Sequence, residues 1–419
     1  MKILETDLEA DLMEREQRFG AHNYHPLPVV LERGEGVFLW DVNGKRYYDF
    51  LSAYSAVNQG HCHPRIIGAL KTQAEKLTLT SRAFYNNKLG ELEEMMSKLF
   101  GFDKVLLMNS GVEAVESALK LCRKWAYLVK GTPEGQATIV FANGNFHGRT
   151  ISVISASTDE TARAGFGPFA PGFIHVPYND LAALEKVFRA NPHIAGFIVE
   201  PIQGEAGIIV PDAGYLAGVS ALCKKHNILY IADEIQTGIA RTGDLLCSYD
   251  IAAPAHQPDI LILGKALSGG VMPVSAVLAN DDIMLTIQPG EHGSTFGGNP
   301  LACAVALEAL QVVIDEDLSG NALKMGELFR DGLRKIAAKN AFITTVRGKG
   351  LLNAIVIDCP ESSDMAWQLC REFAKNGLLT KPTHGNKIRL APPLVITKEQ
   401  IGESLEIIDR SLREFARKI

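Results

Sequence analysis

The chain has 419 residues, of which 47% are hydrophobic and 21% are charged, and its formal net charge is −6. This composition is ordinary for a globular protein with a large buried core, and the length predicts two subdomains. No run of lysine and arginine resembles a nucleic-acid arm or a polybasic membrane patch. A small molecule is therefore the expected partner, and neither nucleic acid nor a membrane is.

The seven cysteines are scattered and contain no C-x-x-C pair, so neither a disulfide framework nor a zinc site is indicated. Residues 1–7 turn acidic at once, without an apolar secretory core or an Arg/Ser-rich transit pattern. No uncharged apolar stretch approaches the ~20 residues that cross a bilayer. These features predict a cytoplasmic protein.

The first predicted element is a β-hairpin of residues 36–41 and 46–50, because Asn43-Gly44 supplies the positive φ angles of a tight turn. Strands and helices then alternate. Most of the strand candidates are continuous apolar runs, which is typical of strands covered on both faces. They are residues 104–108, 137–141, 173–176, 195–199, 228–232, 260–263 and 274–278.

Helical periodicity at 113–128 and 215–225 completes an αβ alternation, which predicts an α/β fold with a mainly parallel central sheet flanked by helices. From about residue 299, long helices dominate and strands are expected at 351–357 and 387–390. This change indicates a smaller α+β domain that the N-terminal hairpin joins. The expected boundaries are an N-terminal segment 1–55, a large cofactor-binding domain 56–300 and a small C-terminal domain 301–419.

Lys265 is the first candidate site residue, since ligands of an open α/β sheet bind at the carboxyl ends of its strands. It follows the apolar run 260–263 and precedes Gly269-Gly270. Most lysines are exposed. Here desolvation and nearby positive charge would lower the pKa of the amine and free it to attack a carbonyl. At this point Lys265 can be interpreted either as an exposed lysine or as a reactive one.

Asp233 ends a second apolar run, 228–232. Alone, it could cap the next loop. A carboxylate there would also keep the ring nitrogen of pyridoxal 5′-phosphate protonated, and this protonation makes the cofactor an electron sink. Two strand ends could bracket one ring, so Asp233 and Lys265 together are more informative than either residue.

A third strand end runs into a helix at Ser110. Ser110 and Glu113 have capping-box spacing, and Gly111 allows the backbone to approach a ligand closely. The N–H groups of a helix N-terminus favour a phosphate. A capping box alone explains the motif equally well.

These residues resemble the class III, fold type I aminotransferases, and the resemblance covers nearly the whole chain. The matching segments are residues 109–114, 146–149, 200–205, 233–238, 264–270 and 292–300. The resemblance implies a pyridoxal-phosphate dependent transaminase. In it, Lys265 bears the cofactor as a Schiff base and shuttles the proton, and Asp233 pairs with the pyridinium nitrogen.

The family also implies contacts to the rest of the cofactor. Gln236 approaches the phenolic oxygen, and Phe146 and Ile235 enclose the ring. Thr295 reaches the phosphate of the neighbouring subunit, which implies a homodimer with composite sites and leaves a higher oligomer open. The full set is Ser110, Gly111, Val112, Phe146, His147, Asp233, Ile235, Gln236, Lys265, Ser294 and Thr295.

Within the family, residues 20–28 and 52–64 resemble the members that act on ornithine. These transfer the δ-amino group of ornithine to 2-oxoglutarate by a ping-pong mechanism. The products are glutamate and glutamate 5-semialdehyde, which cyclises to pyrroline-5-carboxylate, a reaction of arginine metabolism and proline biosynthesis. Arg149 suits the carboxylate of ornithine and Tyr24 its α-amino group, while Tyr54 joins the substrate pocket.

Arg389 is the family's candidate for the α-carboxylate of glutamate. An unpaired arginine there would penalise ornithine, whose methylene chain takes the same place. The resemblance assigns Glu205 as a gate that pairs with Arg389 for ornithine and moves aside for glutamate.

Several alternatives stay open. The substrate could be N-acetylornithine, 4-aminobutyrate or another ω-amine, and a racemase or aminomutase of the same fold type would need no amino acceptor. A non-catalytic binding protein would ordinarily lack the lysine or the aspartate. His61-Cys62-His63 and Arg347 are interpreted as structural residues, and no metal is expected.

Overall fold

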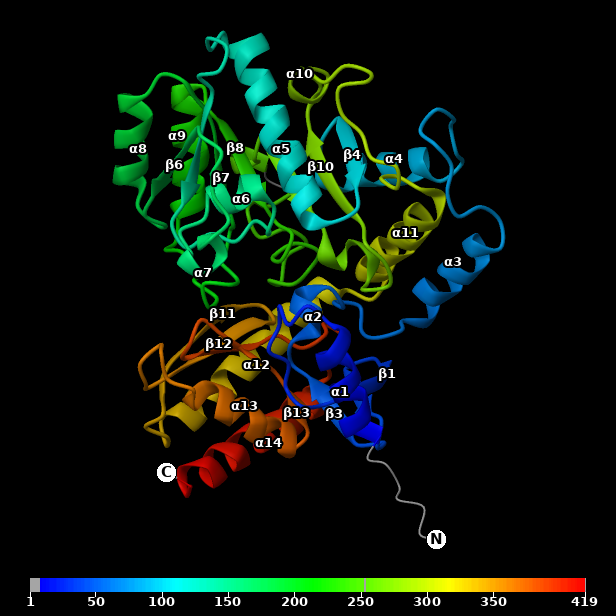
Figure 1. Ribbon diagram of the computed structural model, residues 1–419, viewed down its shortest axis with the longest axis vertical. Helices are drawn as coiled ribbons and strands as arrows, with labels where there is room; N and C mark the ends of the chain where they lie inside the picture. Colours follow the sequence, from blue (N-terminus) through cyan, green and yellow to red (C-terminus); the bar gives the residue numbers. More distant parts are fainter. Residues whose placement is uncertain (1–7, 252–253, 419) are drawn as a thin grey trace.

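The computed structural model describes residues 8–251 and 254–418, which form an upper and a lower lobe in Figure 1. The upper lobe contains a seven-stranded sheet in which β10 runs antiparallel to both neighbours and the other pairs are parallel. The predicted mainly parallel sheet is confirmed. Its order is β4 (Lys104–Met108), β10 (Ser275–Ala279), β9 (Ile260–Leu263), β8 (Leu229–Asp233), β7 (Ile194–Val199), β5 (Thr138–Ala142) and β6 (Phe173–Val176).

The sheet is apolar on both faces, and the pleat divides its side chains between two hydrophobic clusters. Ile260 and Ile262 of β9 pack on the side of α5 (Gly111–Trp125). Leu261 and Leu263 belong to the cluster on the opposite face, with α8 (Leu181–Ala190) and α9 (Tyr215–His226). Continuous apolar runs are therefore required, because successive side chains enter different layers.

The remaining helices of the upper lobe, drawn around this sheet in Figure 1, include short turns as well as long elements. They are α3 (Pro64–Ala74), α4 (Leu89–Phe100), α6 (Ile151–Ser155), α7 (Glu160–Arg163), α8 (Leu181–Ala190), α9 (Tyr215–His226), α10 (Asp281–Met284) and α11 (Pro300–Asp315). In the part of the chain that the structure describes, no helix combines the length and the apolar character needed to cross a bilayer.

The lower lobe is a smaller α+β domain built from both ends of the chain. The N-terminal strands β1 (Leu31–Glu35), β2 (Phe38–Asp41) and β3 (Arg46–Asp49) are completed by the parallel strand β13 (Leu378–Leu379). This pairing confirms that the N-terminal hairpin joins the C-terminal part. The other elements are α1 (Leu8–Phe19), α2 (Ser52–Ser55), β11 (Ile343–Lys349), β12 (Leu352–Ile357), β14 (Pro382–Thr383), β15 (Lys387–Leu390), α12 (Leu318–Ala337), α13 (Met365–Lys375) and α14 (Lys398–Ala416).

The hairpin turn between β2 and β3 differs from the expected tight Asn-Gly turn. Of that pair, Gly44 alone has a positive φ, +80°. The Asp41 carboxylate accepts hydrogen bonds from the N–H groups of Asn43 (3.0 Å) and Lys45 (2.9 Å), and the Gly44 N–H donates to the Asp41 carbonyl (2.9 Å). The loop is one residue longer than a two-residue turn, and a single left-handed glycine closes it.

Two further expectations need correction. The helix expected at 113–128 starts at Gly111 and ends at Trp125, after which a π-helical turn, Ala126–Lys130, leads to Gly131 with φ of +79°. Strand β11 was not predicted, because its exposed and partly buried residues lack a clear apolar run.

Arg241, in the loop after β8, ties the two lobes together. It is fully buried, and its guanidinium donates to Asn58 Oδ1 (2.5 Å from Nη2), the Pro392 carbonyl (2.6 Å) and the Leu351 carbonyl (3.1 Å). Burial lowers the pKa of Arg241 to about 9. Burying this charge costs free energy, and the N–H groups of the guanidinium donate to oxygens from both lobes.

Replacing Arg241 with methionine should destabilise the protein by about 3 kcal/mol, because three buried oxygens lose their donor while the volume is nearly kept. Urea unfolding measures this loss. Arg334→Met is the matched control, since Arg334 pairs with Asp331 at the surface (2.8 Å) and should change stability by less than about 0.5 kcal/mol. Equal stability of the two variants would contradict the role of Arg241.

Candidate active site

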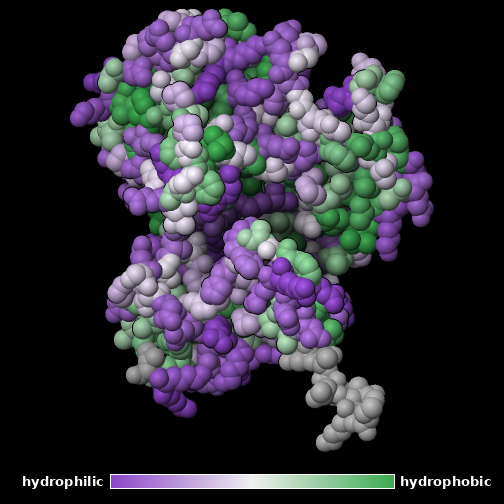
Figure 2. Space-filling model, viewed as in Figure 1, coloured by the Kyte–Doolittle hydropathy of each residue, from purple (hydrophilic) through white to green (hydrophobic). Residues whose placement is uncertain are grey.

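Side chains from three neighbouring strands meet at the carboxyl edge of the large sheet. Asp233 is the last residue of β8 and lies opposite Ile262 of β9, and Lys265 follows the end of β9. Glu200 follows β7, the neighbour of β8 on the other side. Figure 2 shows a hydrophilic hollow between the two lobes. The structure thus brings Lys265 and Asp233 together, as the sequence predicted.

Asp233 is held from two sides. Its Oδ1 accepts the N–H of Ile235 (3.1 Å), and its Oδ2 lies 2.6 Å from Nδ1 of His147. Burial alone would lower the pKa of His147, but the hydrogen bond and charge of Asp233, helped by Glu200, raise it. His147 Nε2 is buried and has no hydrogen-bond partner among the described residues. The Asp233 carboxylate is therefore oriented by the Ile235 N–H and by His147.

Lys265 begins the 3₁₀ turn Lys265–Ser268 and has a φ of +43°, in the left-handed region that non-glycine residues rarely adopt. Burial lowers the pKa of its amine; Glu205 and Asp233 oppose this effect, and Arg389 adds to it. A lysine with a lowered pKa and a strained backbone at a strand end fits a reactive amine better than an exposed solvated one.

The N-terminus of α5 lies beside these residues. Ser110 and Glu113 form the predicted capping box, in which the Ser110 N–H donates to the Glu113 carboxylate (2.6 Å). The N–H groups of Gly111 and Val112 have no partner within the described parts of the chain. A side chain on Gly111 would press on Ile235, at 3.1 Å. Two free donors and a close backbone approach can therefore serve a phosphate.

Arg389, in β15, lies on the small-domain side of the site and is almost completely buried. Its Nη2 donates to Glu205 Oε1 (2.7 Å), while its Nε and Nη1 are buried without a partner among the described residues. Burial would raise the pKa of Glu205, but the charge of Arg389, with that of Lys265, lowers it. Gln236 Nε2 also donates to Glu205 (3.2 Å). The arginine therefore has donors left for a second acceptor.

Tyr54 packs against Arg389, with the guanidinium carbon 5.2 Å from the ring centre. It lies in α2, whose four residues, Ser52–Ser55, all have positive φ, so the turn is left-handed. Such a conformation costs about 1–2 kcal/mol per residue. Asp49 Oδ1 offsets this by accepting the N–H groups of Leu51 (2.8 Å) and Ser52 (2.9 Å). Strain held in this way at a pocket is typical of functional sites.

Two cavities open onto this group. One of about 190 Å³ is lined by Tyr54, Glu205, Arg389 and residues 381–384. The other, of about 320 Å³, is lined by Phe146, His147, Arg149 and Glu205 among others. Arg149 is exposed and lies over the Phe146 ring at 5.2 Å, so its guanidinium is accessible to an anion.

Three predicted residues lie apart from this group. Thr295 is exposed, and Ser294 Oγ accepts a hydrogen bond from Asn109 (2.8 Å), just before α5. Tyr24 is 73% exposed, beside a cavity of about 940 Å³ between α1 and Trp367. Burial and the charge of Glu205 raise the pKa of the Tyr54 phenol, Arg389 lowers it, and Tyr24 is the last of the groups that raise it.

Sequence reasoning gave Glu200 no role of its own, although the family motif contained it. Its position directly after a fully buried strand was the available signal. His61 and His63 do not share a ligand: His61 pairs with Asp49 (2.7 Å) and His63 with Glu316 (3.0 Å).

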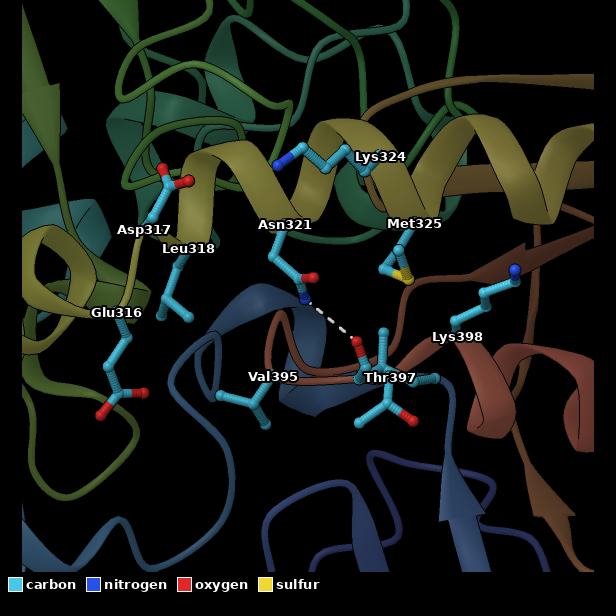
Figure 3. A pocket seen from close by; sticks show the side chains of 10 residues that line it. Glu316, Asp317, Leu318, Asn321, Lys324, Met325, Val395, Thr397 and Lys398 are labelled. Atoms are coloured by element: carbon cyan, nitrogen blue, oxygen red, sulfur yellow. Dashed lines mark hydrogen bonds between the residues drawn. The ribbon is translucent and has the colours of Figure 1, made fainter.

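A separate pocket of about 440 Å³ lies at the N-terminal ends of α12 and α14, away from the strand edge (Figure 3). Asn321 points into it but donates to the carbonyls of Leu394 (2.5 Å) and Ile396 (3.0 Å). Thr397 caps α14. Asn321 and Thr397 therefore stabilise the fold.

Comparison with known proteins identifies the family. The model of the class III aminotransferases matches residues 19–412. "Ornithine aminotransferase, mitochondrial" of Rattus norvegicus is 61% identical over 96% of this chain and 90% of that protein. A structure of the ornithine aminotransferase from Toxoplasma gondii, with partial occupancy of PLP, has a TM-score of 0.95 at 47% identity, covering 99% of this chain and 96% of that one. One described as acetylornithine aminotransferase from Elizabethkingia anophelis has a TM-score of 0.89 at 59% identity, covering 97% and 99%. The chain belongs to the class III aminotransferases.

Proposed function

We propose that this aminotransferase moves the δ-amino group of L-ornithine to 2-oxoglutarate. The products are glutamate and glutamate 5-semialdehyde, which cyclises to pyrroline-5-carboxylate. The names of the rat and Toxoplasma relatives support the ornithine assignment. The single structural observation that carries it is the ion pair of the buried Arg389 with the partly buried Glu205.

The two substrates place different groups beside the reacting carbon. Glutamate reacts through its α-amino group, so its α-carboxylate lies there, whereas ornithine reacts at its δ-amino group and places methylene groups there. A buried arginine suits the carboxylate and penalises the methylenes, since an uncompensated buried charge costs several kcal/mol. Glu205 neutralises Arg389 when ornithine binds. When glutamate binds, the 2.7 Å hydrogen bond between Glu205 and Arg389 breaks and the arginine is free to pair with the substrate carboxylate. One site can thereby accept both substrates.

The residues present fit pyridoxal phosphate, the cofactor of this family. Asp233 would hold the ring nitrogen, Phe146 and Ile235 the ring faces, Gln236 the phenolic oxygen, and Gly111 and Val112 the phosphate. In support, the N–H groups of Gly111 and Val112 at the start of α5 have no partner in the described chain and can donate to a phosphate. When bound, this cofactor supplies an aldehyde and an electron sink for the bond that is cleaved.

The residues of the chain then divide the work. The amine of Lys265, whose pKa is lowered by burial, would hold the cofactor through its aldehyde and would accept the proton that leaves Cδ of ornithine. Asp233, which His147 supports, would maintain the positive charge of the ring nitrogen. Arg149 would bind the carboxylate at the far end of ornithine, Tyr24 would bind its α-amino group, and Tyr54 would line the substrate pocket.

A second candidate substrate is N-acetylornithine. The accessible Arg149 and the exposed Tyr24 leave room for an acetyl group. The Elizabethkingia neighbour is named for its action on acetylornithine. Titrating the holoenzyme with ornithine, N-acetylornithine or 4-aminobutyrate, while following the cofactor absorbance, separates the candidates. The proposal expects ornithine to react most efficiently; a clear preference for N-acetylornithine would replace it.

Replacing Glu205 with glutamine should shift the preference from ornithine to glutamate. Arg389 would keep its charge without a compensating carboxylate, so the ratio of kcat/KM for ornithine to that for glutamate should fall about tenfold or more. Single-turnover measurements with each amino acid give this ratio. The control is Glu361→Gln, which removes a carboxylate from the rim, where Glu361 pairs with Lys387. An unchanged ratio in Glu205→Gln would argue against the gate.

We also propose a cytoplasmic homodimer in which Ser294 and Thr295 complete the phosphate site of the partner subunit. Support for association comes from exposed apolar side chains: Phe84 is 71% exposed and Phe296 55%. Sedimentation analysis tests the dimer, and cell fractionation tests the compartment, since the rat relative is named mitochondrial. The domain boundaries at residues 55 and 300 stay predictions that limited proteolysis can test.

A further inference from the structure

We propose that Glu200 is a positioning residue that joins the ring-contact side of the site to the substrate gate. It holds Phe146 in place through one carboxylate oxygen and the start of the loop 204–207 through the other. The inference rests on the proposed function, because it assigns Phe146 to the cofactor and Glu205 to the substrates.

The carboxylate of Glu200 is buried at the end of β7 and divided between two segments. Its Oε1 accepts the N–H of Phe146 (2.9 Å), and its Oε2 accepts the N–H of Gly204 (3.3 Å). Phe146 follows β5, the neighbour of β7, and Gly204 lies in the loop after β7, so the carboxylate joins the loops that follow two adjacent strands. A single rigid group therefore sets the distance between the ring contact and the loop that carries Glu205.

The small domain fixes the same loop from the opposite side. Thr383 Oγ1 donates to the Glu205 carbonyl (2.6 Å), and Arg347 donates to the Gly207 carbonyl (2.6 Å from Nη2). With Glu200 at Gly204, the backbone on both sides of Glu205 is held. A movement of the loop would break these bonds, so we expect the gate to open by rotation of the Glu205 side chain.

The electrostatic surroundings agree with a functional position. Burial raises the pKa of Glu200 to about 7; the charge of His147 lowers it, and that of Asp233 raises it. Burying a carboxylate near the charge of Asp233 costs free energy. Phe146 and Gly204 provide the backbone donors that keep it there.

The test compares Glu200→Gln and Glu200→Asp with Asp259→Asn in the holoenzyme. The amide of Glu200→Gln can accept only one of the two N–H groups, and the shorter Glu200→Asp cannot reach both. Asp259 is the matched control: its carboxylate also accepts a backbone N–H, from Tyr230 (2.7 Å), but at the opposite edge of the sheet. Thermal unfolding gives the structural cost of each change.

Three readouts distinguish positioning from stability. Hydrogen exchange should accelerate in the peptides around Phe146 and Gly204, the visible circular dichroism of the bound cofactor should weaken, and kcat/KM should fall about tenfold or more with ornithine and with glutamate. Asp259→Asn should leave all three within about twofold, even at an equal loss of Tm.

The proposal is overturned if Glu200→Gln lowers the Tm as Asp259→Asn does and leaves exchange, dichroism and both half-reactions unchanged. If Glu200→Gln does not fold, Glu200→Asp is judged by the same criteria. Failure of the proposed function would be separate: wild-type protein would then react with glutamate but not with ornithine, while exchange and the glutamate half-reaction still test Glu200.

Discussion

Replacing Lys265 with alanine is expected to lower kcat at least about a thousandfold, since the variant loses both the nucleophilic amine and the group that moves the proton. The structure supports this effect because Lys265 is the lysine at the carboxyl edge of β9, beside Asp233 and Glu205. Steady-state assays with ornithine and 2-oxoglutarate measure the loss.

Small primary amines added to Lys265→Ala should restore part of the rate, because they can move the proton in place of the missing side chain. The control is Lys98→Ala, which removes an exposed lysine paired with Glu94 (2.5 Å). Its rate should equal that of the wild type. A Lys265→Ala variant with more than about a tenth of normal activity would contradict the assignment.

The Asp233→Asn variant should lose about a hundred- to thousandfold in kcat, the range seen when one preorganised charge partner is removed. An amide cannot keep the ring nitrogen charged, and His147 loses the carboxylate that raises its pKa. Stopped-flow absorbance of the ornithine half-reaction measures the effect.

Asp259→Asn again serves as the control, since it makes the same change of atoms at the far edge of the sheet. It should react at close to the wild-type rate. Equal rates for Asp233→Asn and the wild type would show that the carboxylate does not contact the ring.

Much of the fold could be predicted because the sheet is buried on both faces. The strand candidates at 104–108, 173–176 and 260–263 coincide with β4, β6 and β9, and the other four differ from β5, β7, β8 and β10 by one residue at one or both ends. Strand β11 was missed because it lies partly exposed in the small domain, where apolar patterning is weaker. The prediction of positive φ angles at Asn43-Gly44 holds only for Gly44, because the Asp41 side chain, and not the dipeptide alone, organises the loop.

At the site, strand ends predicted the meeting of Lys265 and Asp233, since residues after parallel strands share one edge. Contacts between segments that are distant in the sequence could not be predicted in this way. Nothing local predicts that Ser52–Ser55 forms a left-handed turn, because the turn depends on Asp49 and on the Ala391 carbonyl, which accepts the Ser52 hydroxyl (2.7 Å). The two backbone contacts of Glu200 likewise appear only when β5 and β7 are placed side by side.

The most direct test of the account is to reduce the holoenzyme with borohydride, digest it and locate the cofactor by mass spectrometry. We expect a single covalently labelled peptide, with the added mass on Lys265. A label on another lysine, or an unlabelled protein that still contains the cofactor, would contradict the central claim that this amine holds pyridoxal phosphate beside Asp233.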